Sequence, residues 1–125
     1  MSDKPAYHLH MAPFAGRVRV TWRGQTIADS ASAIKLEESR HEPVYYLPRS
    51  DARMELFQRT ARSTHCPHKG DASYFSLVSA DGARAENAVW SYETPIPKSA
   101  AIKEHLAFYT KEMGADFGIE IVASA

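Results

Sequence analysis

Residues 72–92 read ASYFSLVSADGARAENAVWSY, and this stretch decides the fold class. Two runs rich in aromatic and β-forming residues, 72–79 and 85–92, flank the dipeptide Asp81-Gly82. Asp-Gly between two such runs is typical of a β-hairpin, because glycine readily adopts the positive φ of a tight turn. The stretch therefore predicts two antiparallel strands joined by a short turn.

Outward from this hairpin, short strands and turns continue in both directions. Apolar and polar residues alternate from Arg17 to Trp22, which indicates a half-buried strand. Further strands are expected at 25–28, 34–36, 44–47, 106–109 and 117–122, with short helical patterns at 50–58 and 99–104. Many short strands favour an antiparallel sandwich, barrel or related β architecture. We expect a mainly β fold with one or two short helical turns, as a single domain over residues 14–125 that follows an N-terminal arm, residues 1–13.

Length, charge and cysteine usage restrict the class of protein. A chain of 125 residues is one domain's worth of sequence, and its 15 basic and 15 acidic residues cancel. Zero net charge provides no general attraction to nucleic acid or to an anionic membrane. One cysteine cannot form an internal disulfide, and we find neither a signal peptide nor a stretch of membrane-spanning length. We expect a cytoplasmic protein with no nucleic-acid or membrane partner.

The densest group of chemically versatile residues is at 62–71, which reads RSTHCPHKGD. A thiolate is a nucleophile, and nearby cations lower the pKa of a cysteine. His65 and Lys69 lie within three positions of Cys66, while Pro67 and Gly70 favour a rigid, sharp turn. We take Cys66, Lys69 and His65 as candidate catalytic residues. The alternative is that Cys66 is a small, buried apolar residue at the end of a strand.

Neither a metal site nor a phosphate loop is expected in this segment. His65, Cys66 and His68 are possible zinc ligands, but structural zinc usually requires four ligands in paired knuckles. Lys69-Gly70 lacks the additional glycines of a phosphate-binding loop. We therefore predict no metal and no cofactor.

Aromatic and basic residues elsewhere suggest a ligand-binding pocket. Trp90 and Tyr92 lie two positions apart, on one face of their strand, where they could form the floor of a pocket or pack in the core. The candidate binding residues are Tyr46, Arg49, Trp90, Tyr92 and His105. Arg49 could hold an anion or belong to a solvated turn, and His105 could be an acid or base near neutral pH.

Six segments together resemble a bacterial family known as domain of unknown function 427. They are VTWRGQ (20–25), ADS (28–30), VYYLPR (44–49), THCPHKGDASY (64–74), AVWSYE (88–93) and IKEHLAFY (102–109). The resemblance implies a compact β fold similar to the β-tent group, without the paired cysteines of that group's zinc sites. Two positions depart from the family pattern: His68 stands where a bulkier aromatic is common, and Glu104 stands where glycine is usual.

These observations lead to three functional hypotheses. The first is a domain, which could be an enzyme, that binds a small molecule around the His-Cys-Pro-x-Lys-Gly segment, with Lys69 and Arg49 holding an anionic group. The second is a non-catalytic protein-interaction module. The third is nucleotidyl transfer, as a label carried by the family suggests.

Overall fold

The computed structural model describes residues 8–111 and 114–124, and they form ten strands and four short 3-10 turns. The strands are β1 (Leu9–Pro13), β2 (Gly16–Trp22), β3 (Gln25–Ser30), β4 (Ile34–Glu38), β5 (Val44–Pro48), β6 (Phe57–Cys66), β7 (Gly70–Val78), β8 (Arg84–Ser91), β9 (His105–Phe108) and β10 (Phe117–Ala123). The turns are η1 (Arg49–Asp51), η2 (Met54–Leu56), η3 (Pro97–Ile102) and η4 (Gly114–Asp116). None of the helical segments in this part of the chain is long and apolar enough to span a bilayer.

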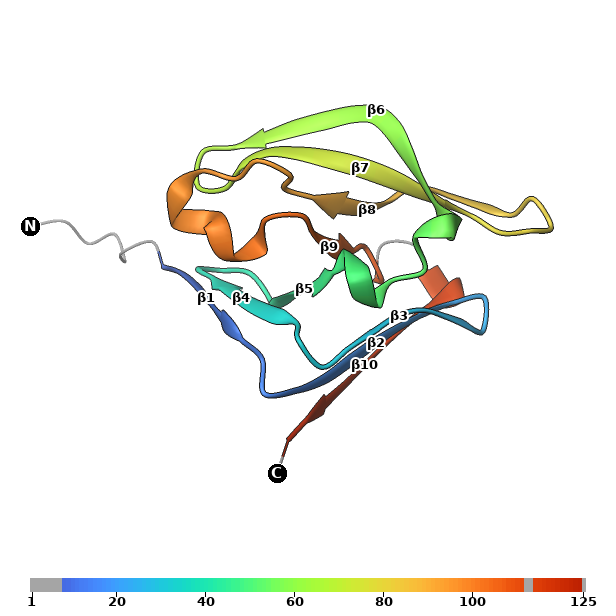
Figure 1. The fold of residues 1–125 in the computed structure, drawn as a ribbon, viewed down its shortest axis with the longest axis horizontal. Coiled ribbons are helices and arrows are strands. Elements are labelled where there is room, and N and C mark those ends of the chain that lie inside the picture. The colour runs from blue at the N-terminus through green and yellow to red at the C-terminus, as the bar shows by residue number, and fades with distance from the viewer. Residues whose placement is uncertain (1–7, 112–113, 125) are drawn as a thin grey trace, which may run out of the picture.

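The strands form two antiparallel sheets. The larger has seven strands in the order β1-β4-β5-β9-β8-β7-β6, and the smaller has three in the order β10-β2-β3. Figure 1 shows the β6–β8 layer along one side of the molecule, with β2, β3 and β10 along the opposite side. This mainly β fold without a long helix is the class that the sequence predicted.

The seven-stranded sheet is apolar on both faces. In β5, Leu47 points into a core built with the smaller sheet, whereas Tyr46 points the other way. The main core is centred on Val18, Val20, Trp22, Ile27, Leu47, Phe75, Leu77, Val89 and Leu106. The aromatic core is formed by Leu36, Tyr46, Ala72, Tyr74, Tyr92, Ile102 and Ala107, with Trp90, Tyr109 and Cys66 packed against it. Successive residues of a strand face opposite sides, so each strand supplies both cores.

The hairpin around Asp81-Gly82 is confirmed as β7 and β8, which place Tyr74 opposite Trp90 and Phe75 opposite Val89. Gly82 adopts a φ of 88°, in the region that glycine favours. The predicted strands at 17–22, 25–28, 34–36, 44–47, 106–109 and 117–122 are also present, with ends that differ by a few residues.

One expectation needs correction. The segment 50–58 is not one helix, because η1 and η2 are separate turns and Phe57 already begins β6. The dense segment 62–71 contains the end of β6 at Cys66, a turn at residues 67–69 and the start of β7 at Gly70, so a turn lies where Pro67 and Gly70 indicated one. The boundary between arm and domain stays a prediction: Leu9–Pro13 form β1, which pairs with β4 along its whole length, while residues 1–7 lie outside the described residues.

The departure at Glu104 has a structural consequence. Its φ of 60° lies in the left-handed region, and its backbone N–H donates to the Tyr92 carbonyl at 2.9 Å. A Cβ in this region costs about 1 kcal/mol, whereas glycine has no such penalty. The exposed Glu104 side chain is therefore attached to a strained backbone position.

We predict that Glu104→Gly raises the free energy of unfolding by about 0.5–1 kcal/mol, because relief of strain exceeds the entropy lost by glycine. Urea denaturation of both proteins measures the change. Glu104→Ala is the matched control and should give no such gain, since it retains the Cβ. A glycine variant no more stable than the alanine variant would contradict the strain argument.

Candidate functional site

An open groove of about 850 Å³ lies over the aromatic core. Its lining includes Tyr45, Tyr46, Tyr74, Trp90, Tyr92, Phe108 and Tyr109. The β4–β5 loop forms one wall through Arg40, His41 and Glu42, and Ile119 and Ile121 of β10 border it as well. A smaller hollow beside Trp22 and the β7–β8 turn is crossed by an exposed Arg23–Asp81 ion pair and has fewer aromatic residues. The groove is therefore the better candidate for a binding site.

Lys69 enters the groove from a tightly held turn between β6 and β7. Its backbone N–H donates to the Cys66 carbonyl at 3.2 Å, and its carbonyl accepts from the Ile96 N–H at 3.0 Å. The Ser99 hydroxyl donates to the His68 carbonyl at 2.7 Å. Gly70 has a φ of 113°, and an added Cβ would lie 3.4 Å from the backbone at residues 94–96. Pro67 and Gly70 thus contribute the rigid, sharp turn that the sequence indicated.

Lys69 is the one charged residue that is buried in the part of the chain that the structure describes. The residue is 8% exposed, and its Nζ donates to Glu38 Oε1 at 3.0 Å. The same nitrogen lies 5.9 Å from the centroid of the Tyr92 ring, within the range of a cation–π interaction. Burial of a charge is unfavourable unless it is paired, and Glu38 and the ring face supply the compensation. The pair gives the groove a donor and an acceptor side by side.

Tyr46 and Trp90 fix the floor of the groove. The Trp90 indole Nε1–H donates to the Tyr46 hydroxyl oxygen at 3.1 Å, and the two rings meet edge to face. Tyr46 is 1% exposed, and this burial raises the pKa of its hydroxyl well above the ordinary value. Burial raises the pKa of Tyr92 in the same way. Both phenols are therefore held neutral over the whole physiological range.

Tyr74 differs from these two tyrosines. Its hydroxyl lies 2.9 Å from Thr64 Oγ1 and 3.4 Å from the Tyr109 hydroxyl, and the guanidinium carbon of Arg62 lies 4.8 Å from its ring centroid. Burial alone would raise the pKa of Tyr74, but hydrogen bonds with Thr64, Tyr109 and Arg62 outweigh it and lower the pKa. Tyr74 is consequently the easiest of these three phenols to ionise.

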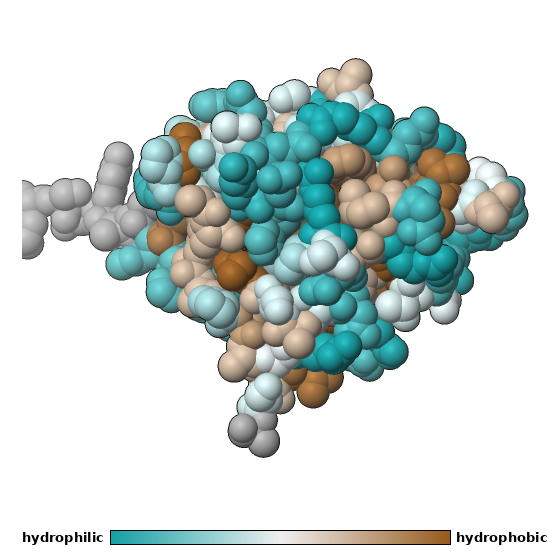
Figure 2. Space-filling model, in the orientation of Figure 1, coloured by the Kyte–Doolittle hydropathy of each residue, from teal (hydrophilic) through white to brown (hydrophobic). Residues whose placement is uncertain are grey.

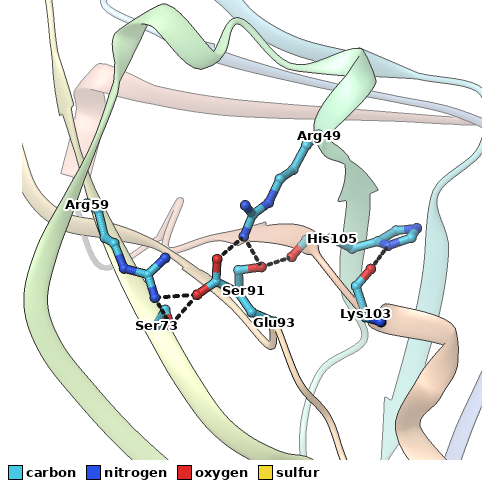
Figure 3. Close-up of polar contacts among 7 residues, drawn as sticks. All are labelled: Arg49, Arg59, Ser73, Ser91, Glu93, Lys103 and His105. Atoms are coloured by element: carbon cyan, nitrogen blue, oxygen red, sulfur yellow. Dashed lines mark hydrogen bonds and ion pairs between the residues drawn. The ribbon is translucent and has the colours of Figure 1, made fainter.

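A separate polar network lies on the main-core face of the same sheet. Figure 3 shows the Glu93 carboxylate between the guanidinium groups of Arg49 and Arg59. Arg49 Nη2 donates to Glu93 Oε2 at 3.0 Å, and Ser73 Oγ donates to Glu93 Oε1 at 2.8 Å. The two guanidinium carbons lie 5.3 and 5.9 Å from the centroid of the Phe75 ring, which belongs to the main core.

This network links consecutive strands of the seven-stranded sheet. Arg59 and Ser73 come from β6 and β7, and Glu93 follows β8. Arg49 follows β5 and also donates to Ser91 Oγ at 3.0 Å, while Ser91 donates to the His105 carbonyl of β9 at 2.7 Å. Arg49 therefore interacts with Glu93 and Phe75 in this structure, and its predicted role in holding an anion stays a prediction.

The structure places most of the predicted site residues either in the groove or in the polar network. Tyr46, Lys69, Trp90 and Tyr92 lie together in the groove. Arg49 and the backbone of His105 belong to the polar network, and His105 Nδ1 lies 2.9 Å from the Lys103 carbonyl (Figure 3). The other two catalytic candidates are His65 and Cys66.

His65 and Cys66 end strand β6, directly before the turn that carries Lys69. The His65 side chain is exposed and pairs with Asp71 at 2.7 Å. Cys66 is half-buried and packs against the aromatic core. A catalytic role for these residues remains a prediction.

Glu38, Tyr74 and Tyr109 border the groove but were not chosen as candidates from the sequence. For Tyr74 a signal existed: it lies in the strand that forms a hairpin with the strand of Trp90, and paired strands share faces. Glu38 and Tyr109 are distant from Lys69 in the chain, and no local pattern connects them to it. Within residues 8–111 and 114–124, no group of three or more His, Cys, Asp or Glu side chains is arranged to hold a metal ion.

Residues 10–117 match the model of a protein family described as "Domain of unknown function (DUF427)", whose short label, NTP_transf_9, refers to nucleotidyl transfer. No curated protein matches the chain.

We predict that Glu93→Gln lowers the free energy of unfolding at pH 7 by roughly 1–3 kcal/mol, because it removes the charge between two arginines. The Arg59 guanidinium, with Ser73 and Arg49, lowers the pKa of Glu93 from 4.5 to about 2. This stabilisation is complete above pH 4.5 and is lost as the pH falls toward 2. Denaturation at several pH values should therefore show the two proteins converging in acid.

Glu86→Gln provides the matched control. Glu86 accepts hydrogen bonds from Arg84 and Ser76, but it is exposed and has no second arginine partner. Its removal should have little effect. An equal loss in the two variants, or a loss at Glu93 that persists unchanged at low pH, would show that the Glu93 network does not stabilise the sheet as described.

Proposed function

The chain belongs to the DUF427 family, whose description assigns no activity, and we propose from its groove that it is a small-molecule-binding domain. The ligand has a planar, apolar part that lies against Trp90 and Tyr109 and an anionic group that reaches Lys69. The observation that carries this proposal is the buried ammonium group of Lys69 within an aromatic groove.

The aromatic walls support the apolar part of the ligand. Trp90 and Tyr109 are only half-buried, and their ring centroids lie 4.3 Å apart. Half-buried aromatic rings beside a groove offer a flat surface of large area, on which planar ligands gain both burial and stacking. The hydrogen bond between Trp90 and Tyr46 fixes the indole before a ligand arrives. A preformed surface loses little entropy on binding.

The charges of the groove support an anionic group. Three cationic side chains line it (Arg40, Lys69 and Lys111), against two carboxylates (Glu38 and Glu42), which leaves one net positive charge. Lys111 and Glu42 form an exposed ion pair near the opening. Lys69 is the cation among the aromatic residues, and a hydrogen bond to an anion is stronger there than in water.

We predict that the dye 8-anilinonaphthalene-1-sulfonate, which joins a planar body to a sulfonate, binds the folded protein with one-to-one stoichiometry and quenches tryptophan fluorescence. Lys69→Met should weaken this binding about tenfold or more, because a charge-assisted hydrogen bond contributes roughly 1.5 kcal/mol or more. Lys69→Arg, which keeps the charge, should retain part of the affinity. Fluorescence titration measures all three proteins.

Lys98→Met is the matched control, because Lys98 is exposed beside His68, outside the groove lining. It should bind the dye like the wild type, with thermal melts confirming that each variant is folded. Equal affinity of the Lys69→Met variant and the wild type would refute the proposed role of Lys69. Competition by mononucleotides, with magnesium-dependent turnover, would favour the alternative of nucleotidyl transfer.

A further inference from the structure

Strand β10 combines an open sheet edge with apolar side chains. It lies at one end of the order β10-β2-β3. Within the described part of the chain, the large hydrophobic residues that are exposed are Ile119 at 42%, Ile121 at 42% and Val122 at 58%, and all three belong to β10. Figure 2 shows apolar surface at the lower edge of the molecule, along which β10 runs in Figure 1. Such an edge is a ready template for another strand.

The pairing of β10 with β2 shows which of its backbone groups face outward. The Arg23 N–H donates to the Asp116 carbonyl, and the Ser124 N–H donates to the Ala15 carbonyl. Even-numbered residues of β10 therefore direct their backbone groups toward β2, because the direction alternates along a strand. The N–H and C=O groups of the odd-numbered residues, Ile119 and Ile121 among them, point away from β2 to the open edge.

The other long edge in the structure is protected in ways that β10 is not. Strand β6 carries Arg59 and Arg62 and has an irregular register against β7, and both features discourage edge pairing. Strand β10 pairs with β2 without a register shift and contains no proline or lysine. Its one charged residue, Glu120, is paired with Arg19 of β2 at 2.9 Å. Nothing along this edge repels an incoming strand.

We infer that β10 pairs antiparallel with β10 of a second copy of this chain, which makes a dimer with a continuous six-stranded sheet. The two-fold axis passes at Ile121, so that Ile121 faces Ile121 of the copy and Ile119 faces Ala123. These odd-numbered pairs use the outward backbone groups, and each pair of opposed residues can exchange two hydrogen bonds. The same patch serves both copies, as two-fold symmetry requires.

Charge and chain geometry select this register. An axis at Glu120 would place the two Glu120 carboxylates opposite each other, which is unfavourable. An axis nearer Phe117 would bring the copy against η4, which leads directly into the strand. With the axis at Ile121, Glu120 faces Val122 of the copy and retains its own Arg19. Zero net charge also removes the general repulsion between copies.

The pairing is independent of the proposed ligand, although Ile119 and Ile121 border the groove as well. If the protein forms no dimer, dye binding can still depend on Lys69. If the dye does not bind, the protein can still form the dimer. The two proposals are thus tested separately.

The test is sedimentation equilibrium of the full chain over a concentration series, with substitutions at Val122. Val122→Lys places a cation opposite Glu120 of the copy, twice by symmetry, and should lower the dimer dissociation constant about fivefold. Val122→Glu places like charges there and should raise the constant by about the same factor. Within one chain Val122 faces Arg17, so the effects on folding stability should have the opposite signs.

The wild type should reach twice the monomer mass as its concentration rises, and the two variants should shift the dissociation constant in opposite directions. Backbone hydrogen exchange gives a second readout, in which the Ile121 amide becomes protected at high concentration. A monomer at every concentration would overturn the proposal and leave the edge to a different partner. A weaker dimer in both variants, or an unchanged constant, would overturn the proposed register.

Discussion

Successive residues of a strand point to opposite faces of the sheet, and this constraint gives one seven-stranded sheet two apolar faces. Leu47, Phe75 and Val89 turn toward the smaller sheet and close the main core. Their neighbours Tyr46, Tyr74 and Trp90 must then turn away from it. The smaller sheet packs on the first face, and Ile102 of η3 packs on the second. The aromatic groove lies over this second face, and its lining also includes Ile119 and Ile121 of β10.

The two faces use charge differently. On the main-core side, Glu93 joins Arg49 and Arg59 over Phe75, so its charges stabilise strand connections. On the groove side, the turn at residues 67–69 presents Lys69 beside Glu38 and Tyr92. On each face, a basic side chain is paired with a carboxylate beside an aromatic ring. They differ in surroundings, since Lys69 lines the groove, whereas the network around Glu93 lies on the main-core face of the sheet.

The sequence predicted strands from two kinds of pattern. The strands around Val18 and Ile34 alternate in polarity, whereas residues 44–47 and 85–92 are compact runs of β-forming residues, and the hairpin at Asp81-Gly82 has its own turn signal. Strand β6 escaped prediction because it is an edge with most side chains exposed, so no polarity pattern marks it. In the site, Trp90 and Tyr92 could be assigned to one face from their spacing. Glu38 and Tyr109 could not, because only the order of strands in the sheet brings them to Lys69.

In this preformed aromatic groove, burial raises the pKa of Tyr46 and of Tyr92, so both phenols stay neutral to higher pH than a free tyrosine. NMR of the chain with ring-labelled tyrosine, titrated toward high pH and assigned with single Tyr→Phe variants, tests it directly. We expect Tyr74 to titrate below its ordinary pKa, whereas Tyr46 and Tyr92 stay neutral until alkali unfolds the protein. Stability should fall as the pH rises above 10, where the unfolded phenols ionise. Reversible titration of Tyr46 and Tyr92 near pH 10 in the folded protein would contradict the account.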